Sequence, residues 1–138
     1  MVWTKLVSRH DRIEIDGTDA SNLFRRFGLT SEHSSEDVSG FSVSGFDETL
    51  AGSTAVEFTG EAFYTEEGAD LLYPIHADRS IVEVYWQPNG LVDSSARAYW
   101  ADCQILRFGP ENQRGSVSVM PFSAKPATED GLQTGDGT

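Results

Sequence analysis

Alternation of apolar and polar residues is the clearest pattern along the chain. In the segment 54–64 one face carries Val56, Phe58, Ala62 and Tyr64, and the other carries Glu57, Thr59 and Glu61. In the segment 80–87 one face carries Val82, Val84 and Trp86, and the other carries Glu83, Tyr85 and Gln87. A period of two is typical of a strand with one face in the core and one in water. The pattern therefore predicts two half-buried strands.

Shorter alternating runs and turn residues predict further strands. Residues 12–16 alternate, residues 16–19 have turn chemistry, and an extended stretch follows over 23–29. The turn at 88–90 leads into 96–108, which holds one long strand or two short ones and ends at Gly109 and Pro110. A last strand is expected over 116–123, with Val117 and Val119 pointing inward.

One helix is predicted between the two alternating strands. Thr65 has the chemistry of an N-cap, and the acidic Glu66 and Glu67 follow in the first turn, where the helix dipole favours them. Pro74 lacks a backbone N–H, so the helix is expected to end or kink near Leu72 or Tyr73.

Together these elements predict a mainly β fold, an antiparallel β-sandwich or partly closed barrel with one short flanking α-helix. Residues 1–124 form the predicted domain. Within it, residues 31–53 are rich in Ser, Gly and Asp and are expected to form a long loop. Residues 125–138 contain too few apolar groups to offset the entropy of ordering them, so they are predicted to be a disordered tail.

Charge and composition exclude several classes of protein. The formal net charge of the 138-residue chain is −12, which argues against general affinity for nucleic acid or for an anionic membrane. The single cysteine, Cys103, permits no internal disulfide and no cysteine-based zinc site. No signal peptide and no membrane-spanning segment are expected from the sequence.

The sequence offers no catalytic, cofactor-binding or metal site. His10, His33 and His76 lie on different predicted elements without the spacing of metal ligands. The segment 40–45 resembles a nucleophile elbow, but the spacing of its glycines and its surroundings do not fit that motif. We therefore expect a protein that is not an enzyme and that uses no cofactor.

Two surfaces remain as candidates for function. A loop as long as 31–53 is uncommon in a small domain unless it binds something, so we expect it to dock onto copies of the same protein. If the strands 54–64 and 80–87 are neighbours, they also present an acidic, hydroxyl-rich face without lysine. An ordinary solvated face is the alternative explanation for that second surface.

The order and spacing of these parts resemble the tail tube (major tail) proteins of long-tailed, siphophage-type phages. The resemblance covers residues 11–124 and rests on the strand and turn over 12–21 and on Asp37-Val38-Ser39-Gly40-Phe41. It continues through Leu50-Ala51-Gly52, the strand 54–64, the short helix, Trp86-Gln87-Pro88-Asn89-Gly90 and the C-terminal strand pair. It implies a structural virion protein that forms hexameric rings, which stack into a hollow tube for DNA delivery.

The resemblance also assigns roles to residues. It implies a lumen lined by Glu57, Thr59, Glu61 and Glu83, where acidic groups would repel DNA phosphates. It implies an inter-subunit loop with Phe41, Phe46 and Leu50 as anchors and Glu36, Asp37, Asp47 and Glu48 at the rim. Those acids would meet basic residues of the next subunit, with Arg25, Arg26 and Arg114 as candidates.

The implied partners are further copies of the chain, together with tape measure, tail terminator and baseplate or tip proteins. Genomic DNA would pass through the lumen without specific binding, and no membrane is involved. The implied location is the virion tail, assembled in the host cytoplasm.

Two other readings of the sequence stay open. A monomeric β-sandwich could bind carbohydrate or another ligand on exposed aromatic residues, with Trp3, Tyr85, Trp86, Tyr99 and Trp100 as candidates. The phase of the strand 80–87 places Trp86 in the core rather than on such a surface. A tail terminator or connector that forms a single ring, or a capsid decoration protein, is the other alternative.

Overall fold

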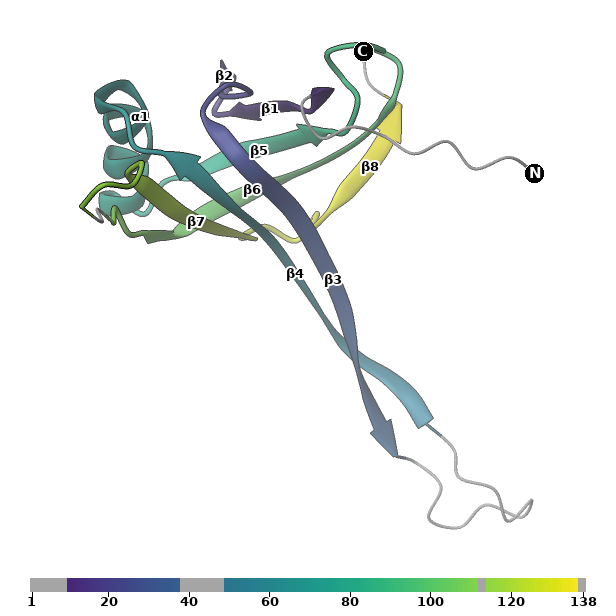
Figure 1. The fold of residues 1–138 in the computed structure, drawn as a ribbon. Coiled ribbons are helices and arrows are strands. Elements are labelled where there is room, and N and C mark those ends of the chain that lie inside the picture. Colours follow the sequence, from purple (N-terminus) through teal and green to yellow (C-terminus); the bar gives the residue numbers. More distant parts are fainter. Residues whose placement is uncertain (1–9, 38–48, 112–113, 137–138) are drawn as a thin grey trace, which may run out of the picture.

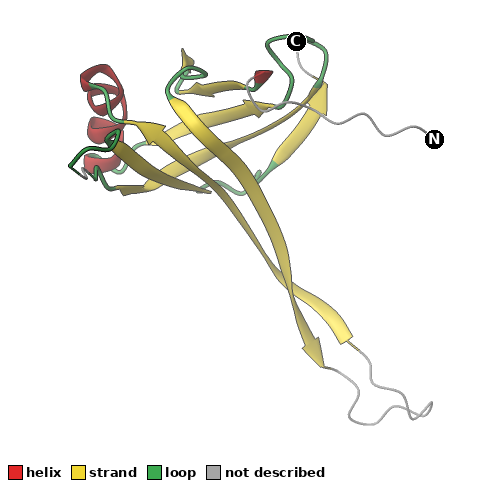
Figure 2. Ribbon diagram, in the orientation of Figure 1, coloured by secondary structure: helices red, strands yellow, loops and turns green. Residues whose placement is uncertain are grey.

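The computed structural model describes residues 10–37, 49–111 and 114–136 (Figure 1). These residues form one antiparallel sheet in the order β2-β1-β5-β6-β7-β4-β3, and β8 also pairs with β6. A single α-helix lies beside the sheet (Figure 2). The prediction of a mainly antiparallel β fold with one short flanking helix is confirmed, and the sheet is not closed into a barrel.

The chain enters the sheet through a tight hairpin. β1 (Arg12–Ile15) and β2 (Thr18–Asp19) pair through Ile15 and Thr18. The two residues between them, Asp16 and Gly17, have φ angles of 54° and 77°. Positive φ at both central positions is the geometry that an Asp-Gly hairpin turn provides.

Three strands form the centre of the sheet. They are β5 (Ile81–Gln87), β6 (Arg97–Phe108) and β7 (Val119–Pro126). The inward positions of these strands are occupied by Val82, Val84, Ala101, Cys103, Ile105, Met120, Phe122 and Ala124, all of them buried. The segment 96–108 is thus one long strand. The prediction that Val117 and Val119 point inward is wrong: Val117 lies before β7 and is 69% exposed, and Val119 has the opposite phase to the buried Met120.

A long hairpin completes the sheet and leaves it. β3 (Phe24–Asp37) and β4 (Thr49–Phe63) pair with each other from Phe24 and Ala62 to Asp37 and Thr49. β4 pairs with β7 only from Phe58 to Phe63. The rest of the hairpin therefore extends away from the body as a two-stranded arm, which we define as residues 30–37 and 49–57 (Figure 1).

The sheet curls so that its two ends face each other across the core. The ring of Phe27 on β3 lies 5.8 Å from that of Trp86 on β5. Phe27 also lies near the rings of Phe24 (5.1 Å) and Phe58 (5.9 Å). This aromatic cluster joins the β3–β4 part of the sheet to the β1–β5 part without a ladder of hydrogen bonds between them, so the sheet curls around its core without closing into a barrel.

The helix α1 (Glu66–Ala77) packs on β6 and begins as predicted. The Gly68 amide donates a 2.9 Å hydrogen bond to the Thr65 hydroxyl, which satisfies one of the unpaired donors of the first turn. The helix continues through Pro74 to Ala77, so the predicted end near residue 72 is wrong. Burial of Ile75 and a 2.9 Å contact between His76 Nδ1 and the Ile105 carbonyl hold the last turn in place.

Two predicted irregular regions contain strands. Of the expected loop 31–53, residues 31–37 belong to β3 and residues 49–53 to β4. Of the expected tail 125–138, residues 125–126 belong to β7 and residues 133–136 form β8 (Gln133–Asp136). Both regions lack the alternating apolar face that identified the other strands.

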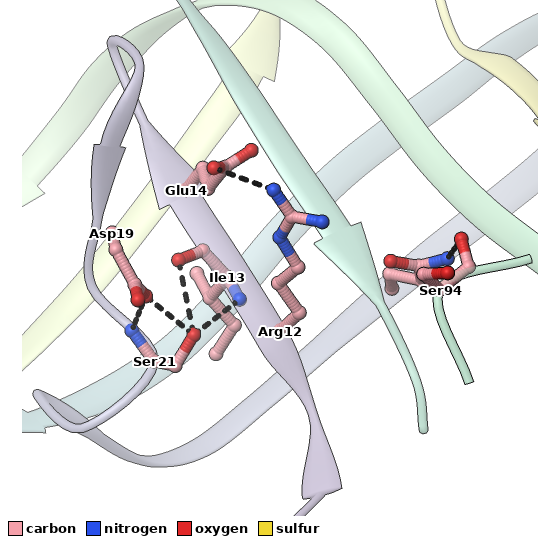
Figure 3. Close-up of polar contacts among 7 residues, drawn as sticks. Arg12, Ile13, Glu14, Asp19, Ser21 and Ser94 are labelled. Carbon is pink, nitrogen blue, oxygen red and sulfur yellow. Dashed lines mark hydrogen bonds and ion pairs between the residues drawn. The ribbon is translucent and has the colours of Figure 1, made fainter. Parts of the chain in front are cut away.

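Polar contacts near the start of the chain fix β1 and the connection after β5. Figure 3 shows the Ser21 hydroxyl between β1 and Asp19: it accepts a hydrogen bond from the Ile13 amide at 3.0 Å and contacts the Asp19 carboxylate at 2.6 Å.

Gln87 is fully buried, although the strand pattern placed it on the water-facing side. The chain after β5 folds over it, and its Nε2 donates to the Ser94 carbonyl at 3.0 Å.

Candidate assembly surfaces

The predicted lumen residues share one face of the sheet. On β4, Glu57, Thr59 and Glu61 alternate with the buried Phe58 and therefore point away from the core. On β5, Glu83 lies opposite the exposed Asp102 of β6, and both point to that same outer face. β4 and β5 are not neighbours, however, because β7 and β6 lie between them.

The outer face carries both signs of charge. Lys125 on β7 is exposed and pairs in register with Gln104 of β6, which places it between the two groups of acids. The Arg25 guanidinium lies 3.4 Å from the Glu61 carboxylate, and the Arg12 guanidinium lies 3.1 Å from the Glu14 carboxylate. The expectation of an acidic face without lysine is therefore wrong: the strands assumed to be adjacent are separated, and the strand between them supplies a cation.

The predicted inter-subunit residues lie in or beyond the arm. Glu36 and Asp37 belong to β3, and Leu50, which pairs in register with Glu36, belongs to β4. Phe41, Phe46, Asp47 and Glu48 lie outside the described residues. Of the basic residues expected to meet the rim acids on a neighbour, Arg26 and Arg114 are exposed, whereas Arg25 pairs with Glu61 of its own chain.

A groove of about 650 Å³ lies at the base of the arm. It opens where β4 separates from β7, between Ala55, Val56 and Glu57 on one side and the connection from β7 to β8 on the other. Thr30, Lys125 and Leu132 also line it. No sequence pattern indicates this groove, because its position depends on where the pairing of β4 with β7 ends.

The candidate aromatic residues divide between the core and the outer face. Trp86 and Tyr99 have ring centres 5.7 Å apart and pack against the core, as the phase of the strand predicted for Trp86. Tyr85 and Trp100 stack on the outer face at 6.1 Å and 26°. The Arg12 guanidinium lies 5.8 Å from the Tyr85 ring centre, and the Trp100 indole N–H donates to Gln133 of β8. Trp3 lies outside the described residues.

The described part of the chain holds no group of three or more His, Cys, Asp or Glu side chains placed to bind a metal ion. Cys103 is fully buried, and burial raises the pKa of its thiol to about 12, so it is protonated at neutral pH. Within the same described residues, no helix has both the length and the apolar character needed to cross a membrane.

Comparisons with known proteins identify the fold. No protein-family model matches the chain, and no curated protein sequence is significantly similar to it. Solved structures of tail assemblies do contain similar chains. A chain from the virion of a native gene transfer agent particle matches with a TM-score of 0.74 and 11% identity, over 97% of this chain and 100% of that one.

Two further solved structures contain chains with a similar fold. A chain from the tail of an empty gene transfer agent particle with C6 symmetry matches with a TM-score of 0.72 and 15% identity, over 94% of this chain and 98% of that one. A chain from the baseplate of the anti-feeding prophage matches with a TM-score of 0.70 and 12% identity, over 96% and 97% of the two chains. At these identities the likeness shows the fold. The chain thus has the fold of subunits from phage-like tail particles, and the predicted resemblance to a phage tail protein is confirmed at that level.

Proposed function

We propose that the chain is a structural, non-enzymatic virion protein that assembles with copies of itself into hexameric rings, and that these rings stack into a hollow tail tube that delivers DNA. The similarity to a chain of a C6-symmetric tail, over nearly the full length of both chains, supports this proposal. Both a tube and a single ring are compatible with this fold, and the surfaces described above decide how copies of the chain meet.

The arm is the observation that carries the proposal. In the described part of the chain, no strand pairs with the outer edge of β3, and none pairs with β4 before Phe58 apart from β3 itself. A two-stranded hairpin is marginally stable in water, and an open strand edge is a template for pairing with another chain. A second copy of the protein provides the partner that the arm lacks.

The connection at the tip of the arm extends this contact. Phe41, Phe46 and Leu50 are the proposed anchors, because large apolar side chains at the centre of an interface supply most of its energy. Glu36, Asp37, Asp47 and Glu48 are the proposed rim, facing Arg26 and Arg114 of the next subunit. A stable contact of this kind buries about 800 Å² on each partner.

The outer face of the sheet is the proposed lumen wall, with Glu57, Thr59, Glu61 and Glu83 among its residues. Its charge is mixed rather than uniformly acidic, because Arg25 and Lys125 lie on the same face. DNA binds proteins mainly through rows of Lys and Arg that neutralise its phosphates. A face whose few cations lie among acidic groups holds DNA weakly, so DNA passes without specific binding. The proposed further partners are tape measure, terminator and baseplate or tip proteins.

Electron microscopy of the purified protein, concentrated and incubated for days, tests the assembly. Hollow tubes or stacked six-fold rings support the proposal. Isolated single rings identify a terminator or connector instead, and a persistent monomer that responds to a sugar or another ligand identifies a binding module. The Tyr85–Trp100 pair on the outer face is the observation that favours this last alternative.

A pair of variants tests the arm. Deletion of residues 41–46 is expected to leave a folded monomer that does not assemble, because the anchors are lost while the body keeps its core. The matched control keeps the length of the connection and replaces only Phe41 and Phe46 by Ser, which separates the loss of the anchors from the shortening of the loop. If the deletion variant still forms tubes, the assignment of this segment to the interface is wrong.

A further inference from the structure

The last strand, β8, is attached to the sheet differently from the others. The strand β6 is paired with β5 along one edge, and its other edge is shared by two strands. β7 covers this second edge from Cys103 to Phe108, and β8 covers it from Arg97 to Trp100. β8 therefore fills the part of the β6 edge that β7 leaves open.

Little apolar surface holds β8 in this position. None of its four residues is buried, and its side-chain contacts are polar. The Thr134 hydroxyl donates to the Ala98 carbonyl at 2.9 Å, and the Trp100 indole donates to the Gln133 side chain at 2.9 Å. The first of these hydrogen bonds is half-buried and the second is exposed, and hydrogen bonds at the surface are readily replaced by water. Opening of β8 therefore requires far less free energy than unfolding of the domain.

The connection before β8 is longer than its span. Pro126 lies opposite Cys103 and Gln133 lies opposite Trp100, so the connection covers three residues of the β6 edge, about 10 Å at the rise of a strand. The seven Cα steps from Pro126 to Gln133 reach about 23 Å when extended. The connection also contains Gly131 with a φ of 59°, a conformation that glycine adopts without strain. β8 can thus leave its place without disturbing β7, once Leu132, which packs against the core just before β8, separates with it.

We propose that β8 is an exchangeable strand, which pairs with its own β6 in the isolated subunit and with β6 of a neighbouring copy in the assembly. This inference rests on the proposed function, because it requires a second copy. The exchange needs no new complementary surface, since the register of residues 97–100 with residues 133–136 re-forms between chains. Each subunit donates one strand and accepts one, which is compatible with a closed ring.

A disulfide between β6 and β8 tests the exchange. Arg97 and Asp136 are both exposed and lie directly opposite each other in the register. Opposite residues of an antiparallel pair have Cα atoms about 4.5–5.5 Å apart, within the range that a disulfide spans. The native Cys103 does not interfere, because it is buried and its high pKa keeps the thiol unreactive.

The double variant Arg97→Cys with Asp136→Cys is oxidised either before or after assembly. Oxidation of the monomer is expected to abolish assembly until a reductant is added. Oxidation after assembly is expected to link neighbouring chains, which appear as multimers on a non-reducing denaturing gel. Each single-cysteine variant serves as a control for non-specific cross-links. A second control, Gln104→Cys with Lys125→Cys, fixes β7 to the same edge of β6 and is expected to assemble when oxidised.

Two results would overturn the exchange while leaving the proposed function intact. One is an oxidised monomer that assembles as fast as the reduced one, and the other is an oxidised assembly that yields only single chains on the gel. If the native protein forms no oligomer under any condition, the proposed function fails, and the exchange fails with it because no second copy accepts the strand.

Discussion

Replacement of Gly60 by Ala tests the packing at the point where the arm joins the body. Gly60 lies on β4 between the fully buried Phe58 and Ala62, and the rings of Phe24 and Phe27 occupy the space that a side chain would fill. An added Cβ would lie 2.7 Å from the Arg26 carbonyl oxygen, 3.1 Å from Phe27 and 3.2 Å from Phe24. The nearest of these atoms belongs to the backbone, so it cannot rotate away.

The size of the effect follows from two opposing terms. Overpacking of a core costs roughly 1–3 kcal/mol. Ala in place of Gly lowers the conformational entropy of the unfolded chain, which stabilises the folded state by roughly 0.4–1 kcal/mol. The expected net loss in the free energy of unfolding is therefore about 1–2 kcal/mol. For a domain of this size each kcal/mol lowers the melting temperature by about 3–5 °C.

Urea unfolding followed by circular dichroism measures this loss, and Gly28→Ala is the matched control. Gly28 lies in the same hairpin, opposite Thr59, and a Cβ there meets no atom within 4 Å. The control is expected to equal the native protein or to exceed it by up to about 1 kcal/mol. If Gly60→Ala is as stable as Gly28→Ala, with the same dependence on urea, the account of the junction is refuted.

Three further predictions concern single groups. Thr65→Ala removes the acceptor for the Gly68 amide and should cost about 1 kcal/mol of unfolding free energy in the same urea assay, while Thr65→Ser should cost little. Hydrogen bonds from the Ser21 hydroxyl and amide lower the pKa of Asp19, so its contribution to stability is present above about pH 4 and disappears as the pH falls through the lowered value. Asp19→Asn should therefore be less stable than the native protein at pH 6 and equal to it at the acid end of a urea–pH series. The Cys103 thiol should react with a thiol reagent only when urea unfolds the protein, and rapid labelling of the native state would contradict its burial.

The parts of the fold predicted correctly are those that leave a local pattern. The strands 54–64 and 80–87 each bury one face, so their sequences alternate, and the N-cap of the helix depends on residues three apart. The end of the helix depends instead on contacts distant in sequence. Pro74 removes one backbone donor, but burial of Ile75 and the contact of His76 with Ile105 outweigh that loss.

The sequence did not predict the paired arm or β8, and the reason is the same for both. A strand that buries no face needs no alternation, and β8 has only exposed or half-buried positions. The arm extends away from the core, and the residues 30–33 at its base are exposed. The backbone hydrogen bonds that hold such strands do not require particular side chains, so no sequence pattern indicates these strands. The same limit applies to the outer face, where Lys125 was missed because it fell in the predicted tail and because sequence alone did not order the strands.

The early end of the β4–β7 ladder has a consequence for how the sequence can change over time. From Phe58 to Phe63, β4 lies on the body, and substitutions at its buried positions are constrained by the core. Before Phe58, in the arm, β4 does not pair with β7, so a substitution there alters neither the core nor the folding of the body. If the arm is the interface proposed above, natural selection can act on it through binding alone, and copies of this gene that diverge in the arm would keep the body while changing the subunits with which they assemble.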